Sequence, residues 1–221
     1  MTAFPDAAAH DYDTRILRMV PGYLLAQDLA AAVLAAAVPP PSTILVAGCG
    51  TGSEILAIAR ALPDACITGV DPSPGMIAAA RRRIDDAGLS GRIRLETATV
   101  DALDDRPDHD ACMVSLVLHF IADDGGKGAF LSGIRRRLRP DARLVLIDPA
   151  AEEGLAPAYG AWLAANGLDA EGVLAVLNRT AHQWHCVSPE RLAALLHQSG
   201  FGPPETFFTA LAYRGVVTNA R

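Results

Sequence analysis

A chain of 221 residues has the length of one α/β domain, with room for at most a small appendage. Hydrophobic residues make up 51% of it and charged residues 20%, which excludes wholesale disorder. The net charge of −6 at pH 7 lacks the basic surplus of proteins that grip a phosphate backbone, so we expect no nucleic-acid partner. The arginine triplets 81–83 and 135–137 leave a local RNA contact open, although a solvated helix face explains both more simply.

The cysteines and the apolar segments bear on the compartment. Four cysteines, at 49, 66, 112 and 186, form no CxxC pair and no disulfide framework, which indicates a reducing compartment. The apolar segment 24–38 carries a charge and is too short to span a bilayer, and no targeting signal is visible. We therefore expect a cytoplasmic protein without a membrane partner; homodimer formation is left open.

The first predicted elements are helices within 13–38, where apolar residues recur at helical spacing. Pro21-Gly22 interrupts this pattern and predicts two helices that meet at a corner. From Thr43 onward, strand and helix patterns alternate, which predicts βαβ units and a parallel sheet. The expected strands are 43–47, 65–70, 92–96, 111–118 and 143–147, and the expected helices between them are 53–62, 75–86 and 127–138.

The last third has a different pattern. Residues 150–187 contain helical stretches but no clear strand, and Ser188 followed by Pro189 predicts the N-cap of a further helix. Segments 206–208 and 210–218 are β-prone and close enough for an antiparallel hairpin at the sheet edge. We expect a three-layer α/β, Rossmann-like fold with a seven-stranded, mostly parallel sheet in one domain. Its expected parts are an N-terminal helical cap (1–42), a cofactor-binding core (43–149), a lid insertion (150–187) and a C-terminal helix with hairpin (188–221).

A glycine loop, residues 48–52, follows the first predicted strand directly. Its glycines let the backbone turn sharply and approach a ligand closely, at the strand end where doubly wound sheets bind ligands. Asp71 comes 21 residues after Gly50, at the end of the next strand, where a carboxylate can accept hydrogen bonds from both ribose hydroxyls. Together these features predict a nucleoside site.

The loop disfavours a dinucleotide. The NAD fingerprint needs glycine where Ser53 stands, and Glu54 would repel a pyrophosphate at the start of the helix. The sulfonium nucleoside S-adenosylmethionine (SAM) carries no phosphate and suits the loop better.

Residues 44–52 resemble the first motif of class I SAM-dependent methyltransferases, and residues 69–73 resemble their second-strand acid motif. Segments 110–120 and 139–146 are similar to their fourth strand and to the passage before their fifth. The resemblance implies that the glycines line the methionine and ribose, that Asp71 holds the ribose, and that Asp101 with Ala102 meets the adenine. The residues expected at the cofactor are Gly48, Cys49, Gly50, Gly52, Asp71, Pro72, Met76, Asp101, Ala102 and Ser115.

One position departs from that family. Its members commonly carry an acid two residues before the first glycine, and here Val46 stands there. The usual anchor for the SAM ammonium group is therefore missing, and Glu54 or a loop carbonyl is the candidate substitute.

The ends of the chain carry a second resemblance. The N-terminal helix corner of carboxy-SAM synthases is similar to Tyr12-Asp13 together with residues 20–23 of this chain. Their C-terminal run is similar to segment 199–215. Those enzymes share the fold but turn prephenate and SAM into a carboxylated cofactor. Such a role needs an arginine for the carboxylate, for which Arg179 is the candidate.

The expected activity is methyl transfer from SAM to an oxygen or nitrogen of a small molecule, releasing S-adenosylhomocysteine. A reaction of the carboxy-SAM synthase kind and a non-catalytic SAM-binding module are the alternatives. His119, near the end of the fourth predicted strand, is the candidate base, with a structural histidine as the other interpretation. Segment 182–186 offers metal-ligand types without a second cluster, so no metal is expected. The predicted substrate-binding residues are Tyr12, Tyr23, Arg179 and Trp184.

Overall fold

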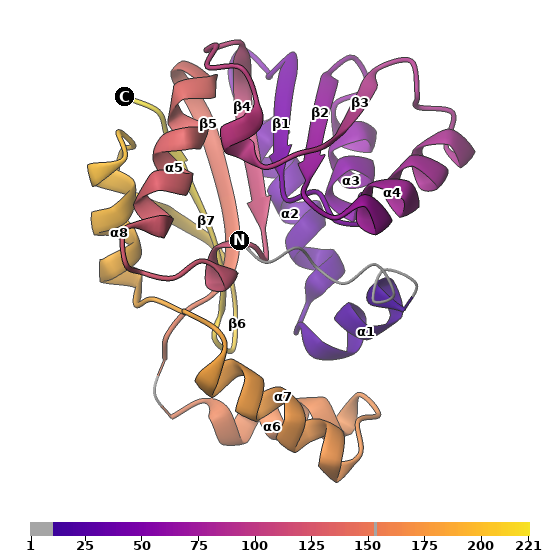
Figure 1. The fold of residues 1–221 in the computed structure, drawn as a ribbon, viewed down its shortest axis with the longest axis vertical. Coiled ribbons are helices and arrows are strands. Elements are labelled where there is room, and N and C mark those ends of the chain that lie inside the picture. Colours follow the sequence, from indigo (N-terminus) through magenta and orange to yellow (C-terminus); the bar gives the residue numbers. More distant parts are fainter. Residues whose placement is uncertain (1–10, 153) are drawn as a thin grey trace.

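The computed structural model describes residues 11–152 and 154–221, which form a seven-stranded sheet with helices on both faces (Figure 1). The strand order is β3-β2-β1-β4-β5-β7-β6. The first five strands are parallel, whereas β7 runs antiparallel to β5 and β6 antiparallel to β7. The strands are β1 (Thr43–Ala47), β2 (Cys66–Asp71), β3 (Ile93–Thr97), β4 (His109–Ser115), β5 (Leu138–Pro149), β6 (Glu205–Ala210) and β7 (Tyr213–Asn219). The predicted fold class and the edge hairpin are confirmed.

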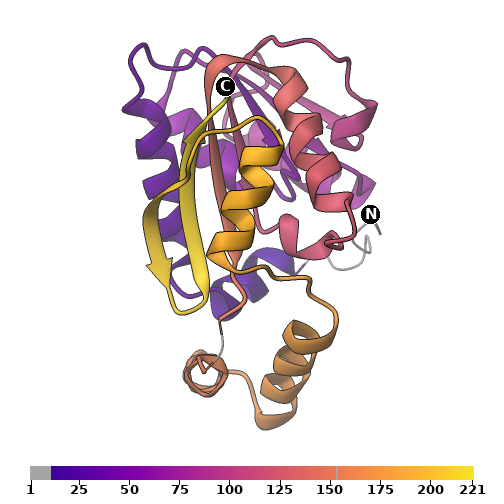
Figure 2. The ribbon, with the colours of Figure 1, turned by 90° about the vertical axis from the view of Figure 1, so that its left-hand side faces the viewer.

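The helices divide between the two faces of the sheet. Helices α2, α3 and α4 cover one face, and α5 and α8 cover the other (Figures 1 and 2). The helices are α1 (Tyr12–Met19), α2 (Tyr23–Ala35), α3 (Ser53–Ala61), α4 (Pro74–Asp86), α5 (Gly126–Arg137), α6 (Ala156–Ala165), α7 (Ala170–His182) and α8 (Pro189–Gln198), with short 3₁₀ turns η2 (Val100–Ala102) and η3 (Leu118–Phe120).

Central strand β1 shows why the apolar runs form buried strands. Its side chains alternate between the two layers: Ile44 and Val46 pack on the α2 and α3 side, while Leu45 and Ala47 pack on the α5 side. All four side chains are at most 1% exposed. A strand covered on both faces needs apolar residues at every position, which is the pattern that the sequence shows.

Side-chain caps begin three of the described helices: Ser73 caps α4, Asp169 caps α7 and Ser188 caps α8. The Oγ of Ser73 accepts a hydrogen bond from the amide of Met76 at 3.3 Å, and proline follows it at the first turn of α4. The Oγ of Ser188 accepts from the amide of Arg191 at 3.2 Å, which confirms the predicted start of α8.

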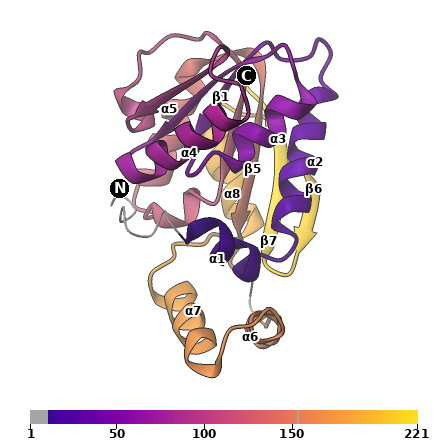
Figure 3. The same ribbon diagram turned by 90° about the vertical axis from the view of Figure 1, so that its right-hand side faces the viewer.

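The N-terminal helices meet at the predicted corner. Helices α1 and α2 are bent by 93° relative to each other, and Gly22 makes the turn with a φ of +69°. Helix α2 packs against α3 and the β5 to β7 side of the sheet, so α1 rather than α2 lies across the carboxyl edge of the strands (Figure 3). The first ten residues of the expected N-terminal cap lie outside the described residues. Among the described residues, no helix taken singly combines the length and apolarity that a bilayer span requires.

Three predicted boundaries were wrong. Strand β4 ends at Ser115 rather than continuing to 118, because Leu116 has a left-handed backbone (φ +57°) that breaks the strand. Strand β5 begins at Leu138, five residues before the predicted Arg143, so the chain passes from α5 into the strand without a loop. Ala210 ends β6 rather than beginning the last strand.

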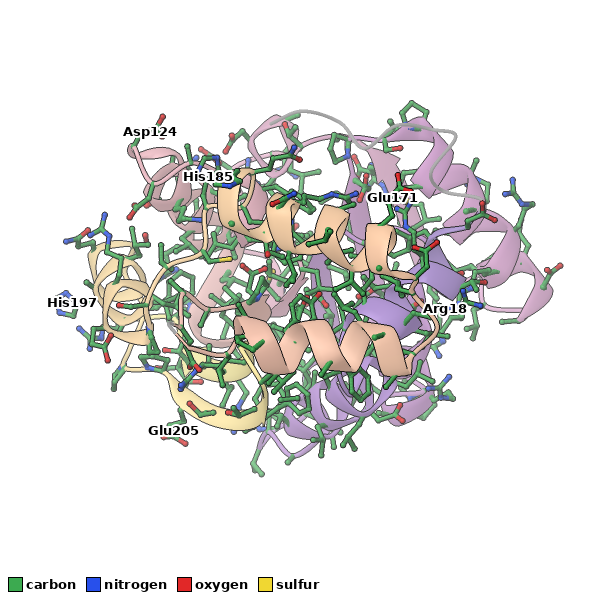
Figure 4. The ribbon with its side chains drawn as sticks, turned by 90° about the horizontal axis from the view of Figure 1, so that it is seen from below. Arg18, Asp124, Glu171, His185, His197 and Glu205 are labelled. Carbon is green, nitrogen blue, oxygen red and sulfur yellow. The ribbon has the colours of Figure 1, made fainter. Side chains whose placement is uncertain are left out.

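Helices α6 and α7 lie beyond the carboxyl ends of the parallel strands, on the same side as α1 (Figures 1 and 3). Figure 4 looks onto these two helices from below and shows them side by side in front of the sheet. The segment after α7 is tied to the core where the amide of His185 donates to the carbonyl of His119 at 2.8 Å. The long connection from β5 to α8 therefore passes over the strand ends.

Replacement of Gly48 by alanine tests the loop geometry. Its φ is +77°, and an added Cβ would lie 2.4 Å from Cγ2 of Val117. We expect Gly48→Ala to lower the free energy of unfolding by about 2–4 kcal/mol, from backbone strain plus overpacking. Gly88→Ala, at φ +69° with no atom within 4 Å of the added Cβ, is the matched control and should cost about 1–2 kcal/mol. Urea denaturation measures both; equal losses would contradict the predicted clash.

Candidate active site

The glycine loop turns the chain out of β1 through left-handed backbone at three glycines. Gly48, Gly50 and Gly52 have φ values of +77°, +49° and +86°. The amides of Gly48 and Cys49 both donate to the carbonyl of Val70, at 2.8 and 2.9 Å. The turn is thereby fixed against the end of β2.

Asp71 connects this loop to the second strand. One carboxylate oxygen accepts from the amide of Gly50 at 3.0 Å, and the other accepts from the amide of Ser73 at 2.9 Å. Burial raises the pKa of the Asp71 carboxyl, and these two hydrogen bonds oppose the rise. Each oxygen keeps a second lone pair, so the carboxylate can still accept from a ligand.

A cavity of about 620 Å³ lies between this loop, α1 and the segment around the end of α7. A second cavity of about 480 Å³ adjoins it and shares Gly48, Pro72 and Phe120. The structure brings most predicted site residues to the first cavity, namely Tyr12, Gly48, Gly50, Asp71, Pro72, Met76, Ser115, His119, Arg179 and Trp184. Asp101 lines the second cavity.

Four predicted residues line neither cavity. Cys49 is fully buried beneath the loop, and an added Cβ at Gly52 would meet Ala80 of α4 at 3.2 Å. Ala102 is exposed at the end of η2. Tyr23 is 5% exposed and donates to Glu54 at 3.3 Å, behind the cavity wall.

His119 lies on η3, just after β4, rather than at the strand end that the sequence predicted. Its Nδ1 is 2.9 Å from an oxygen of Asp148, near the end of the neighbouring strand β5. The ring is 2% exposed and packs against Trp184, with the ring centroids 4.3 Å apart. A neutral ring that donates its Nδ1 proton to Asp148 keeps the Nε2 lone pair for a proton of a ligand in the cavity.

Sequence reasoning missed Asp148 as the partner of His119. A signal was present: Asp148 lies one residue before the end of β5, the strand next to β4, and parallel neighbours end at the same edge of a sheet. Lys127 supports the same region, because its buried Nζ donates to the carbonyl of Leu118 at 2.6 Å. Burial lowers the pKa of Lys127, whereas the charge of Asp148 opposes that change.

A buried polar cluster lies behind the loop. Nε2 of Gln27 donates to Oε1 of Glu54 at 2.9 Å and to Oγ of Ser115 at 3.0 Å. Burial raises the pKa of the Glu54 carboxyl to about 7, although hydrogen bonds from its own amide, Ser115 and Tyr23 act in the opposite direction. Gln27 was not recognised from the sequence, because α2 carries it in an otherwise apolar helix face.

Polar contacts fix α1 over the cavity. Asp13 on α1 accepts from the Oγ1 of Thr51 at 2.6 Å and from a guanidinium nitrogen of Arg83 at 3.0 Å. The same nitrogen of Arg83 lies within hydrogen-bond distance of Thr51 and Ser53. The helix corner and the glycine loop are thereby joined.

Two cationic side chains line the outer part of the first cavity. Arg15 comes from α1 and Arg179 from α7. Neither guanidinium forms a hydrogen bond or ion pair with another described side chain. Among the described residues, no three His, Cys, Asp or Glu side chains lie close enough together to hold a metal ion. The site thus offers a glycine loop bonded to a carboxylate, a histidine paired with a second carboxylate, and two arginines that pair with no other described side chain.

The comparisons with known proteins agree with this geometry. A family model described as a methyltransferase domain matches residues 44–142. Trans-aconitate 2-methyltransferase of Methylobacterium nodulans is 32% identical over 124 residues, covering 56% of this chain and 43% of that protein. Carboxy-S-adenosyl-L-methionine synthase of Campylobacter concisus is 30% identical over 118 residues, covering 53% and 49%. The chain thus spans about half the length of these relatives or less.

A solved structure resembles nearly the whole fold. It is the O-methyltransferase NcsB1 from neocarzinostatin biosynthesis, in complex with SAM and 2-hydroxy-5-methyl naphthoic acid. The TM-score is 0.67 at 20% identity, over 98% of this chain and 58% of that one. The resemblances that the sequence indicated, to class I methyltransferases and to carboxy-SAM synthases, are confirmed.

The buried Glu54 predicts a dependence of stability on pH. A folded pKa raised from 4.5 to about 7 means that the folded state binds this proton more tightly, so stability falls as pH rises through that window. Glu54→Gln removes the titration. We expect its free energy of unfolding, relative to wild type, to increase by about 2–3 kcal/mol between pH 5 and pH 8. Urea denaturation at both pH values measures this; parallel profiles would show that Glu54 does not resist ionisation.

Proposed function

We propose that this chain, whose residues 44–142 form a class I SAM-dependent methyltransferase domain, transfers a methyl group from SAM to a hydroxyl oxygen of a small molecule. The observation that carries the proposal is the His119–Asp148 pair, in the same cavity as the glycine loop and Asp71. Incubation with methyl-labelled SAM and a panel of small hydroxy acids, followed by mass spectrometry, tests it. Products heavier by one methylene group are expected, and their absence across the panel would contradict the proposal.

The residues at the loop fit the nucleoside. Nothing lies within 4 Å of a Cβ built at Gly50, so the backbone there borders open cavity that a ligand can fill. Asp71 would hold the ribose hydroxyls with its remaining lone pairs, and the second cavity, beside Asp101, would take the adenine. When bound, SAM supplies a methyl group already activated by the sulfonium. The protein therefore has to align the acceptor and remove its proton.

His119 would remove that proton. Asp148 fixes the ring by its contact with Nδ1, and Trp184 packs against the ring, so Nε2 has a defined direction. Lys127, held on the carbonyl of Leu118, steadies the short helix that carries the histidine. Helices α1, α6 and α7 would cover the acceptor and limit access of water to the site.

Arg15 and Arg179, whose guanidinium groups pair with no other described side chain, favour an acceptor with an acidic group. Their charges have no acidic side-chain partner in the described structure, and a carboxylate on the acceptor would provide one. The known proteins are consistent with this: one relative is named for trans-aconitate, and the NcsB1 complex holds a hydroxy naphthoic acid. We propose that Arg179 binds the acid, with Tyr12 and Trp184 against the body of the molecule.

The same cations support a second candidate, a reaction of the carboxy-SAM synthase kind, in which the acid is the source of a carboxyl group. Mass spectrometry of the nucleoside that copurifies with the protein separates the two. SAM or S-adenosylhomocysteine supports methyl transfer, whereas a species heavier than SAM by a carboxylate supports the alternative.

Substitution of the proposed base should slow the transfer without weakening nucleoside binding. We expect His119→Gln to lower kcat for a hydroxyl acceptor on the order of 10²–10⁴-fold, while the Kd for S-adenosylhomocysteine changes less than about threefold. Asp148→Asn should also lower kcat, because the ring loses the group that orients it. Steady-state kinetics with calorimetry measures both. A His119→Gln variant with wild-type kcat would exclude His119 as the base.

Substitution of Arg179 should weaken binding of the acceptor, which raises its KM, rather than lower kcat. Arg179→Gln is expected to raise KM for an acidic acceptor by about tenfold or more, the loss expected for a charged hydrogen bond. Arg18→Gln is the matched control, because Arg18 is an exposed residue of α1 outside the cavity lining (labelled in Figure 4). Equal KM values for the two variants would refute the assignment of Arg179.

A further inference from the structure

Two buried tyrosines meet beside the first cavity. Tyr159 lies on α6 and is 8% exposed, whereas Tyr213 begins β7 and is 2% exposed. Their hydroxyl oxygens are 3.0 Å apart, and their rings meet edge to face with the centroids 6.0 Å apart. Of the two, Tyr213 lines the cavity. A hydroxyl of helix α6 is thus paired with a hydroxyl of the sheet.

This pair has one hydroxyl hydrogen more than it has acceptors. Each hydroxyl carries one hydrogen, and the hydrogen bond between them engages one of the two. Neither hydroxyl has another hydrogen-bond partner in the described part of the chain. Burial raises the pKa of both Tyr159 and Tyr213, so both keep their hydrogens at neutral pH. One buried donor is therefore left without an acceptor, and an acceptor on a ligand would satisfy it.

Further donors without acceptors lie on the same side of the cavity. Arg179 is close enough to Tyr159 for its charge to oppose the rise of that pKa. Nε1 of Trp184 is buried and has no hydrogen-bond partner among residues 11–152 and 154–221. Asp71, the one carboxylate among the described residues that line this cavity, already accepts from two backbone amides. This side of the cavity therefore suits a group rich in acceptors, such as a carboxylate.

The sheet register places the tyrosine pair next to the proposed base. Tyr213 is paired with Pro149, the residue that follows Asp148 in β5. The negative charge of Asp148 contributes to the raised pKa of Tyr213, so the two side chains are neighbours. Asp148 in turn lies 2.9 Å from His119. A molecule that presents its hydroxyl to His119 can therefore extend an acid group toward Tyr213.

We propose that Tyr213 donates a hydrogen bond to the acid group of the methyl acceptor, in the same subsite as Arg179, with Tyr159 as a positioning residue. Tyr159 would donate to Tyr213, and Tyr213 would donate its own hydrogen to a carboxylate oxygen, so that both hydrogens have acceptors. Two hydrogen bonds in such a chain strengthen each other, because each polarises the next. This inference rests on the proposed function, because it assumes that an acidic small molecule occupies the first cavity.

Acceptors with and without the acid group test the subsite. Salicylate and phenol share the ring and the hydroxyl, and every other hydroxy acid of the panel is likewise assayed beside its counterpart without the acid. For the best-methylated acid, Tyr213→Phe should raise KM by about tenfold or more, the loss expected for a hydrogen bond to a charged group. The KM of the acid-free counterpart should stay within about threefold. Tyr159→Phe should raise KM for the acid by a smaller factor, about threefold, because it removes a neutral hydrogen bond.

The outcomes separate this inference from the proposed function. Wild-type protein that methylates no member of the panel would refute both. Wild-type turnover of an acid whose KM Tyr213→Phe leaves unchanged would refute the subsite alone. So would an equal rise of KM for the acid and its counterpart, because a merely structural loss does not depend on the acid group. Calorimetric titration with S-adenosylhomocysteine, whose Kd should change less than about threefold, shows that each variant is folded.

Discussion

The site depends on one constraint, the turn by which the chain leaves β1. Three glycines adopt left-handed backbone there, and two successive amides share the carbonyl of Val70. The turn directs the amide of Gly50 at the carboxylate of Asp71. This hydrogen bond joins the end of β1 to the end of β2. Because Gly48 and Gly50 carry no side chains, the backbone itself borders the cavity at these two positions, and α3 begins directly after the loop.

The parallel arrangement explains how apolar strands produce a polar site. The last three residues of each of the strands β1, β2, β4 and β5 are buried, and all four strands end at the same edge. Asp71 and Ser115 end their strands and Asp148 lies one residue from the end of β5, so residues far apart in the sequence surround one cavity. Helix α1, fixed to the loop through Asp13, and the segment after α7 close the outer side.

Much of the fold could be predicted because burial on both faces leaves long apolar runs, and because glycine positions mark the turn of the loop. The site was only partly predictable. The place of His119 depends on the left-handed backbone of Leu116, a non-glycine residue that gives no sign of it in sequence. Gln27 lies in an apolar helix and reaches Ser115, 88 residues away, only through tertiary packing. Such contacts depend on packing across layers rather than on local pattern.

The central claim is that the turn after β1 and Asp71 form a nucleoside site beside the His119–Asp148 pair. A crystal structure of the protein with S-adenosylhomocysteine tests this most directly. The account predicts the ribose hydroxyls on the Asp71 carboxylate, the glycine loop unmoved, and the sulfur facing the cavity that His119 lines. A nucleoside bound elsewhere, or with its ribose away from Asp71, would contradict it.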